Sequence, residues 1–284
     1  MTSGEALQAV TRRLHAAGID DAGVEAELLL RHALSASRTQ IHTESGRVLT
    51  WPETRHLKRL LRRRLDREPS AYILGHCGFY GIDLYINRHT LIPRPETELL
   101  VEATLELARQ LHPPARQLAI ADIGTGCGAI AIALALALPQ ARVYATDISA
   151  AALHVAEINC RQHGVNGRVE LLCGNLLEPL ARSVDMIVAN LPYIKDRELD
   201  NLDPEISRYE PRIALAGGED GLAMIQAMLE QVSEKLRYEA CFLLEIGHGQ
   251  ADAVSSLVNR IFPQATVHLL HDPGGIARVV KAVL

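Results

Sequence analysis

The chain has few cysteines, and none of them is paired at a spacing that metal sites or redox centres use. Its 284 residues contain five cysteines, scattered at Cys77, Cys127, Cys160, Cys173 and Cys241. An odd number leaves no complete set of disulfides, and a CxxC pair does not occur. We therefore expect reduced, mostly buried thiols, no metal site, and the reducing cytoplasm as the location of the protein.

The chain also lacks a long apolar segment and an excess of positive charge. The apolar run Ala129–Leu138 is shorter than the roughly 20 residues that a membrane helix needs. Met1–Val10 has neither the basic start nor the apolar core of a signal peptide. The net charge is −5, whereas proteins that coat nucleic acids are normally basic. We expect a globular protein with no membrane partner and no obligatory nucleic-acid partner.

A small helical domain is predicted at residues 1–70, because three segments carry apolar residues at helical spacing. These segments are Ala6–Ala17, Val24–Leu34 and Trp51–Leu65. The third segment is rich in arginine. Its charge allows two interpretations: a solvated face whose cations favour the helix C-terminus, or a docking surface for an acidic partner or RNA.

A linking β-hairpin is predicted at residues 71–90. Tyr72–Gly75 and Phe79–Ile86 alternate in polarity and carry aromatic residues, as strands of a hairpin do. Prolines then restrict the segment Leu91–Glu98 to an extended conformation, and a helix is expected from Glu98 to Leu111.

Residues 91–284 are predicted to form an α/β domain, since strand and helix patterns alternate after Gln117. Strands are expected at Leu118–Ile123, Arg142–Asp147, Val169–Cys173, Asp185–Ala189, Cys241–Glu245, Val267–His271 and Arg278–Val283. The alternation predicts a mostly parallel sheet that is covered by helices on both faces. A turn cluster at Asp272–Gly275 permits a final hairpin, and therefore one antiparallel edge strand.

A glycine-rich loop lies between the first of these strands and the next helix. Its residues are Gly124, Thr125, Gly126, Cys127 and Gly128. Glycines allow a close backbone approach to a ligand, and the helix N-terminus offers free N–H groups. Asp147 ends the following strand, where a carboxylate can accept hydrogen bonds from ribose hydroxyls. A nucleotide-containing cofactor is more plausible here than a turn next to a surface carboxylate.

The spacing of the glycines also fits NAD, so further residues must decide which cofactor is bound. Asp122, just before the loop, can help to hold an ammonium group, whereas a pyrophosphate would be repelled by it. After the third strand, Asn175 can meet an adenine edge and Leu176 an adenine face. These residues favour S-adenosylmethionine over a dinucleotide.

The tetrapeptide Asn190-Leu191-Pro192-Tyr193 follows the fourth strand. The Asn190 side-chain oxygen and the Leu191 carbonyl can accept the two N–H groups of a flat amide or aromatic amine. Pro192 restricts the backbone, and Tyr193 can stack on the acceptor. Beside the glycine loop, this tetrapeptide predicts methyl transfer to nitrogen. A simple proline-containing turn is the alternative.

The chain resembles the PrmC/HemK family of glutamine methyltransferases over nearly its whole length. The resemblance rests chiefly on Leu91–Glu98, Asp122–Gly128, Asn190–Tyr193, Glu210–Pro211 and Asp220–Leu222. The Pro-Arg-Pro-Glu-Thr-Glu run in the first of these segments is the most specific marker. The resemblance implies a Rossmann-like class I methyltransferase sheet and a helical domain that recognises the substrate. It also implies that Gly124–Gly128, Asp147 and Asn190 contact the cofactor and that Asn190–Tyr193 contact the glutamine.

The resemblance further implies methylation of the side-chain nitrogen (N5) of the glutamine in the Gly-Gly-Gln loop of class 1 peptide chain release factors. Two residues depart from the family pattern: Leu191 stands where Pro is usual, and Asn175 where Asp is common. We expect activity to survive, because the Leu191 carbonyl is retained. A ribosomal-protein glutamine methyltransferase, an adenine-N6 nucleic-acid methyltransferase and a cofactor-binding protein without turnover are the alternatives.

Overall fold

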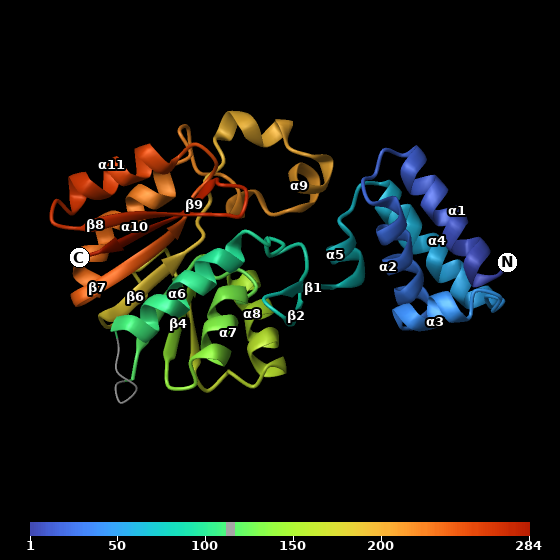
Figure 1. Cartoon of the computed structure of the whole chain (residues 1–284), viewed down its shortest axis with the longest axis horizontal. Helices are drawn as coiled ribbons and strands as arrows, with labels where there is room; N and C mark the ends of the chain where they lie inside the picture. The colour runs from blue at the N-terminus through green and yellow to red at the C-terminus, as the bar shows by residue number, and fades with distance from the viewer. Residues whose placement is uncertain (112–116) are drawn as a thin grey trace. The chain divides into compact units, whose positions relative to one another are not determined.

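The computed structural model describes residues 1–111 and 117–284, and the chain divides into two compact units (Figure 1). The units consist of Met1–His76 with Asp203–Tyr209, and of Cys77–Leu202 with Glu210–Leu284. The first unit therefore takes in a short segment from the second half of the chain. The functional division predicted from the sequence, with boundaries near residues 70 and 90, stays a prediction.

The first unit is built from amphipathic helices around one apolar core. They are α1 (Ser3–Ala16), α2 (Ala22–Leu34), α3 (Arg38–Thr43), α4 (Trp51–Leu65), α5 (Ser70–Leu74) and α9 (Pro204–Tyr209). Capping boxes begin α1, α3 and α4, where the hydroxyls of Thr2, Ser37 and Thr50 accept backbone hydrogen bonds. Leu29 and Leu30 are fully buried in the core that these helices share. The helical prediction for this region is confirmed.

One segment differs from its prediction. Tyr72–Gly75, expected as the first strand of a hairpin, forms most of α5 and its C-cap. The carbonyl of Pro69 accepts hydrogen bonds from the N–H groups of Tyr72 and Ile73, which are both buried. Neighbouring residues can share a buried face in a helical turn, whereas in a strand they point to opposite faces. The burial of both side chains thus favours the helix.

The basic helix α4 contributes both internal ion pairs and exposed cations. Arg64 is only 6% exposed, and its guanidinium lies 3.3 Å from the carboxylate of Glu25 and 2.9 Å from that of Glu205. The exposed cations of the helix are Arg55, Lys58, Arg59 and Arg62. Part of the positive charge therefore stabilises the unit, and both interpretations of the exposed remainder stay open.

The second unit contains a two-stranded hairpin and a seven-stranded sheet. The hairpin strands are β1 (His76–Phe79) and β2 (Ile82–Tyr85); the sheet strands are β3 (Ala119–Ile123), β4 (Arg142–Asp147), β5 (Val169–Cys173), β6 (Val184–Ala189), β7 (Leu236–Glu245), β8 (Thr266–His271) and β9 (Ala277–Val283). The sheet order is β5-β4-β3-β6-β7-β9-β8. The ladders up to β7 are parallel, and those of β9 with β7 and with β8 are antiparallel. The predicted mostly parallel sheet with an antiparallel edge is confirmed.

Helices cover both faces of this sheet (Figure 1). The helices of the unit are α6 (Thr97–Leu111), α7 (Ala129–Ala137), α8 (Ala150–Gln162), α10 (Ala223–Lys235) and α11 (Ala251–Ile261), with 3-10 turns at Asp196–Asn201 and Arg212–Ala214. The chain moves outward from β3 through α7 and α8, and in the opposite direction from β6 through α10 and α11. Right-handed crossovers in opposite directions place these two pairs of helices on opposite faces. Because strands β3 to β7 are parallel, their carboxyl ends meet at one edge of the sheet. A ligand crevice is expected at that edge.

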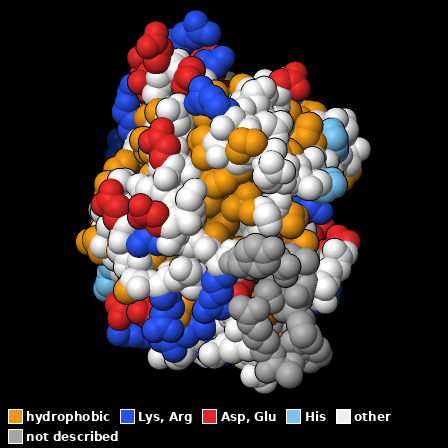
Figure 2. Space-filling model, turned by 90° about the vertical axis from the view of Figure 1, so that its left-hand side faces the viewer, with side chains coloured by type: hydrophobic (Ala, Val, Ile, Leu, Met, Phe, Trp, Pro, Cys, Tyr) orange, Lys and Arg blue, Asp and Glu red, His pale blue; other side chains and the backbone are white. Residues whose placement is uncertain are grey.

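The surface of the sheet unit carries charges of both signs. Figure 2 shows apolar side chains at the centre of one face, with basic and acidic side chains interspersed around them. Among the described residues that are visible on this face, positive side chains do not form one broad, uniform area (Figure 2). Among the residues that the structure describes, no helix is both long enough and apolar enough to cross a lipid bilayer.

Candidate active site

A cavity of about 400 Å³ lies at the carboxyl ends of β3, β4, β5 and β6. Its lining includes residues from each of the four strand ends that the sequence singled out. These residues are Gly124, Gly126, Asp147, Asn175, Leu176, Asn190, Leu191 and Pro192. Most of the predicted cofactor residues and three of the four predicted acceptor residues thus share one cavity. Asp122, Thr125, Cys127, Gly128 and Tyr193 are not part of its lining.

The glycine loop is held against the end of β4 by backbone hydrogen bonds. The N–H groups of Gly124 and Thr125 both donate to the carbonyl of Thr146 at 2.9 Å. Gly124 has φ +72°, and a Cβ atom there would lie 3.3 Å from the side chain of Leu191. The left-handed backbone therefore favours glycine, and an added methyl group would also lie in tight contact with the acceptor segment.

Asp122 organises the loop from beneath. Its carboxylate is fully buried and accepts hydrogen bonds from the Thr125 hydroxyl at 2.6 Å and from the Ala131 N–H at 3.1 Å. Burial raises the pKa of Asp122 to about 7. These contacts assign Asp122 a role in shaping the loop, and its predicted contact with an ammonium group stays a prediction.

Asp147 lies at the cavity with both carboxylate oxygens engaged by backbone donors. Oδ2 accepts from the Gly126 N–H at 2.9 Å, and Oδ1 accepts from the Ser149 N–H at 2.8 Å. Burial raises its pKa, although these hydrogen bonds favour the ionised form. Because each carboxylate oxygen can accept a further hydrogen bond, Asp147 can still bind a pair of hydroxyl groups.

The end of β5 contributes an apolar wall. Leu176 is 8% exposed and lines the cavity, whereas the half-buried Asn175 uses its side-chain amide to donate to Glu178 at 2.8 Å. The sequence interpretation missed two large apolar residues in the lining, Ile148 and Ile213, which are 55% and 58% exposed. Ile148 directly follows Asp147, and this position after a strand end was the signal in the sequence that could have identified it as a lining residue.

A second lining segment that was not predicted comes before helix α6. His89, Thr90 and Leu91 contribute to the cavity, just ahead of the Pro-Arg-Pro-Glu-Thr-Glu run. This segment comes from a different part of the chain than the strand ends, and only the folded structure brings it to them. The prolines that follow this segment predicted an extended conformation, but they did not indicate that the segment lies at the cavity.

Asn190 directly follows β6 and is placed by two neighbouring elements. Ala189 pairs with Leu244 in the parallel ladder, so Asn190 lies beside Glu245, the last residue of β7. The Asn190 side-chain amide donates to the hydroxyl of Thr97, at the start of α6, over 3.1 Å. The amide nitrogen therefore points toward α6, and the Asn190 side chain keeps its oxygen as an acceptor.

A glycine-containing segment packs closely against the backbone of Pro192 and Tyr193. The Ile194 N–H donates to the Leu215 carbonyl at 3.0 Å, and the Gln250 amide donates to the Tyr193 carbonyl at 3.1 Å. Gly221 has φ +79°, and a Cβ atom there would collide with the Tyr193 carbonyl oxygen. This packing fixes the path of the chain just after the tetrapeptide.

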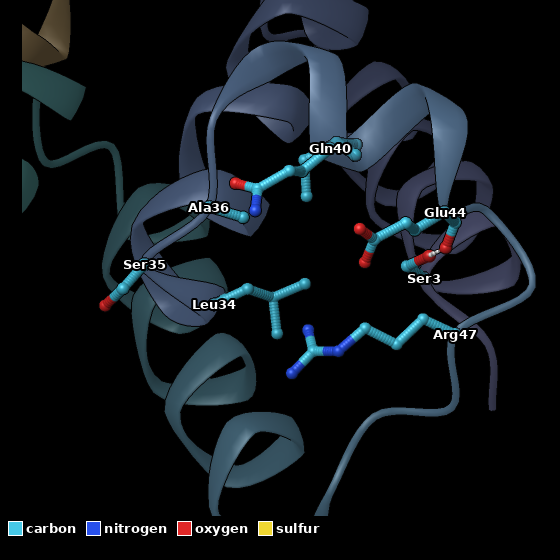
Figure 3. A pocket seen from close by; sticks show the side chains of 8 residues that line it. Ser3, Leu34, Ser35, Ala36, Gln40, Glu44 and Arg47 are labelled. Atoms are coloured by element: carbon cyan, nitrogen blue, oxygen red, sulfur yellow. Dashed lines mark hydrogen bonds between the residues drawn. The ribbon is translucent and has the colours of Figure 1, made fainter.

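A smaller hollow of about 230 Å³ lies in the helical unit (Figure 3). Its polar groups have local partners: the Ser3 hydroxyl donates to the Glu44 carbonyl at 2.8 Å, and Arg47 contacts Glu53 at 2.5 Å. None of the predicted site residues lines it. Among the described residues, no group of three or more His, Cys, Asp or Glu side chains is arranged to hold a metal ion.

Family models and curated proteins place this site in a known family. A model of the PrmC N-terminal domain matches residues 5–75, and a model of the methyltransferase small domain matches residues 97–206. The release factor glutamine methyltransferase of Koribacter versatilis is 37% identical over 282 residues, covering 99% of this chain and 98% of that protein. The one from Moorella thermoacetica is 40% identical over 283 residues, with coverage of 99% and 98%. The chain belongs to the release factor glutamine methyltransferase family.

Solved structures agree with the family in fold. The catalytic domain of hMettl16, in complex with the MAT2A 3′UTR hairpin 6, has a TM-score of 0.57 at 17% identity and covers 72% of this chain and 76% of that one. A methyltransferase from Pyrococcus furiosus has a TM-score of 0.52 at 17% identity, covering 81% and 97%. The predicted Rossmann-like class I methyltransferase fold is confirmed.

The segment that most strongly suggested this family from the sequence has a structural role at the site. The buried carboxylate of Glu210 lies 2.5 Å from the Arg94 guanidinium and accepts the Ile92 N–H at 3.3 Å. Glu98, further along the segment, accepts the N–H of Tyr80 in the hairpin at 2.8 Å. The Pro-Arg-Pro-Glu-Thr-Glu run is thus fastened at both ends, next to the residues that line the cavity.

Proposed function

We propose that this chain transfers a methyl group from S-adenosylmethionine to the side-chain amide nitrogen of the glutamine in the Gly-Gly-Gln loop of class 1 release factors. The observation that carries this proposal is the shared cavity, which Asn190 and Leu191 line together with Gly124 and Asp147. An amide receptor and a nucleotide site are thereby adjacent. The names of full-length relatives favour a release factor over adenine or a ribosomal protein as the acceptor.

The chemistry of the lining fits S-adenosylmethionine. Asp147 offers carboxylate oxygens to ribose hydroxyls, and Gly124 lets the backbone approach the ligand closely. Ile148 and Ile213 add exposed apolar surface against which a flat adenine ring can pack, and Asn175 is available to its edge. When bound, the cofactor supplies a methyl group that is activated by a positively charged sulfur.

The residues of the tetrapeptide prepare the acceptor. A primary amide nitrogen is a poor nucleophile, because its lone pair is delocalised into the carbonyl. The Asn190 side-chain oxygen and the Leu191 carbonyl accept its two N–H groups and orient it. Burial raises the pKa of Tyr193 to about 12, so its ring stays neutral and can stack on the amide. Since the methylated amide can lose its proton afterwards, catalysis rests on orientation and electrostatics.

We further propose that the helical unit recognises the release factor, with no nucleic acid required, and that the reaction takes place in the cytoplasm. A model of the PrmC N-terminal domain covers that unit, and exposed cations of α4 are available to a partner. All five cysteines are free thiols, as a reducing compartment requires.

A methylation assay with labelled S-adenosylmethionine tests the acceptor. The purified protein should label a class 1 release factor, and replacing the glutamine of the Gly-Gly-Gln loop by alanine should abolish the label. Double-stranded DNA, total RNA and ribosomal protein should remain unlabelled in parallel reactions. Labelling of one of these, with the release factor untouched, would overturn the proposed acceptor.

A further inference from the structure

The side chain of Asn190 lies beside two buried groups that are not among the predicted site residues. Thr97 begins α6 and is 4% exposed, and Glu245 ends β7 and is 3% exposed. Strands β6 and β7 lie side by side in the sheet, which puts Asn190 and Glu245 at neighbouring strand ends (Figure 1). Helix α6 supplies the third group from one face of the sheet.

Polar contacts connect the three side chains. The Asn190 amide nitrogen donates to Thr97 Oγ1 at 3.1 Å. Thr97 and Asn190 also act on the Glu245 carboxyl group, where they oppose the rise in its pKa that burial causes. The acidic Glu96 and the basic Arg278 also act on this carboxyl group. Glu245 Oε2 itself has no hydrogen-bond partner among the described residues.

The direction of these hydrogen bonds follows from the chemistry of the groups. Since the pKa of Glu245 is raised to about 7, its carboxyl group is ionised above that pH and can then only accept, which directs the single hydroxyl proton of Thr97 toward it. Thr97 can then only accept from Asn190, which requires the amide nitrogen on that side. With its nitrogen donating to Thr97, the Asn190 amide leaves its oxygen free to face the cavity that Asn190 lines.

We propose that Thr97 and Glu245 are positioning residues, which hold the Asn190 amide with its oxygen toward the acceptor nitrogen. This inference rests on the proposed function, because the oriented oxygen receives the N–H of the acceptor amide. A carboxylate buried without a full set of partners costs stability, and apolar residues would fill the same space more favourably. The orientation of Asn190 is the benefit that offsets this cost, and such compromises are expected at functional sites.

Three variants test the proposal by the split between turnover and binding. Thr97→Val removes the hydroxyl at nearly constant shape, Thr97→Ser keeps it, and Glu245→Gln replaces the obligate acceptor by a group that can also donate. With a release factor as acceptor, Thr97→Val and Glu245→Gln should lower kcat by about 10- to 100-fold. Thr97→Ser should stay within about threefold of the wild type, and the Kd for S-adenosylmethionine should change little in all three.

Two outcomes of the kinetic test would overturn the proposal. One is wild-type kcat in Thr97→Val. The other is an equal loss of kcat and cofactor affinity in Thr97→Val and Thr97→Ser, since that pattern indicates a packing role only. Thermal unfolding of each variant establishes that it is folded at the assay temperature.

A second measurement is independent of the acceptor. The side-chain NH2 resonances of Asn190, assigned by their absence in Asn190→Ala, should be protected from exchange in the wild type and in Thr97→Ser, and exposed in Thr97→Val. Protection that persists in Thr97→Val would overturn the positioning role. If the protection pattern holds but the wild type fails to label a release factor, the proposed acceptor is wrong and the positioning role stands.

Discussion

Two buried carboxylates support the two sides of the cavity, and they do so differently. Asp122 lies near the end of β3 beneath the glycine loop, and Glu245 lies at the end of β7 beside Asn190. Burial raises the pKa of each to about 7. Asp122 bonds to a residue of the loop and to the backbone of α7, so it shapes main chain. Glu245 lies at the strand end next to Asn190, where we propose that it orients a functional group.

This difference indicates how binding and turnover are divided in the molecule. On the cofactor side, backbone groups of the glycine loop and the carboxylate of Asp147 form the binding surface. Cofactor affinity therefore depends on the conformation of the loop. On the acceptor side, one amide side chain must be oriented within hydrogen-bond reach of a nitrogen. Variants of the first side should change cofactor affinity and stability together, whereas side-chain variants that affect the orientation of Asn190 should reduce turnover with less effect on either.

Asn190→Ala should show the largest effect, because it removes the oriented acceptor oxygen. We expect kcat for release factor methylation to fall by about 100- to 1,000-fold, as it does when other preorganised polar groups are deleted from active sites. The Kd for S-adenosylmethionine, measured by calorimetry, should stay within a few fold of the wild type. Asn175→Ala is the matched control on the cofactor side, where affinity should weaken and kcat at saturating cofactor should hold.

A comparable loss of kcat and cofactor affinity in Asn190→Ala would contradict the proposed division of the cavity into a cofactor side and an acceptor side. It would show that Asn190 mainly shapes the cofactor pocket. A large fall of kcat in Asn175→Ala at saturating cofactor would have the same meaning from the other side.

Asp122→Asn tests the cofactor side through the pH dependence of stability. In the folded state burial raises the pKa of Asp122 from 3.8 to about 7. Between these values the folded state holds a proton that the unfolded state has lost, so this group's contribution to the free energy of unfolding falls as pH rises. The difference in stability between wild type and Asp122→Asn should therefore decrease by a few kcal/mol from about pH 4 to pH 7, and level off above.

Urea unfolding of both proteins at half-unit pH steps measures this difference. Glu245 has a similarly raised pKa, but it is present in both proteins and cancels in the comparison. A difference that is independent of pH, or that grows as pH rises through this range, would show that Asp122 is already ionised in the folded protein. The raised pKa of the buried Asp122 would then be wrong, and its role in supporting the loop would rest on its hydrogen bonds alone.

Much of the fold and of the candidate site could be predicted from the sequence, because they depend on local patterns. Strand and helix alternation gave the parallel sheet, and polar residues after strands indicated which ends meet. Glycine spacing and Asp147 pointed to a nucleotide site. Tyr72–Gly75 was predicted incorrectly because its alternation resembles a strand over a length too short to show helical periodicity.

The contacts that orient the site were not accessible in the same way. Thr97 and Asn190 are 93 positions apart in the chain, and nothing in either segment indicates that they are hydrogen-bonded. Residues 89–91 reach the cavity through the same kind of long-range packing, and Glu210 forms its ion pair with Arg94 in the same way. Whether a polar residue touches the ligand or supports a loop, as Asp122 does, is likewise decided by packing alone.

Gly221→Ala should give the smallest of these effects and tests whether the acceptor side depends on close packing. Gly221 and Gly249 have nearly the same backbone, with φ values of +79° and +80°. An alanine methyl group meets the Tyr193 carbonyl oxygen at the first position and nothing within 4 Å at the second. Each variant should lose about 1 kcal/mol for the left-handed backbone, and Gly221→Ala about 1–3 kcal/mol more for the collision.

The measurement is urea unfolding of both alanine variants, followed by kcat at saturating substrates. Because the collision displaces the backbone that follows Pro192, kcat should fall in Gly221→Ala and stay near the wild-type value in Gly249→Ala. Equal destabilisation of the two variants would mean that the Tyr193 backbone moves aside freely. In that event the glycine segment does not fix the tetrapeptide, and the orientation of the acceptor would depend on the hydrogen bonds of Asn190 alone.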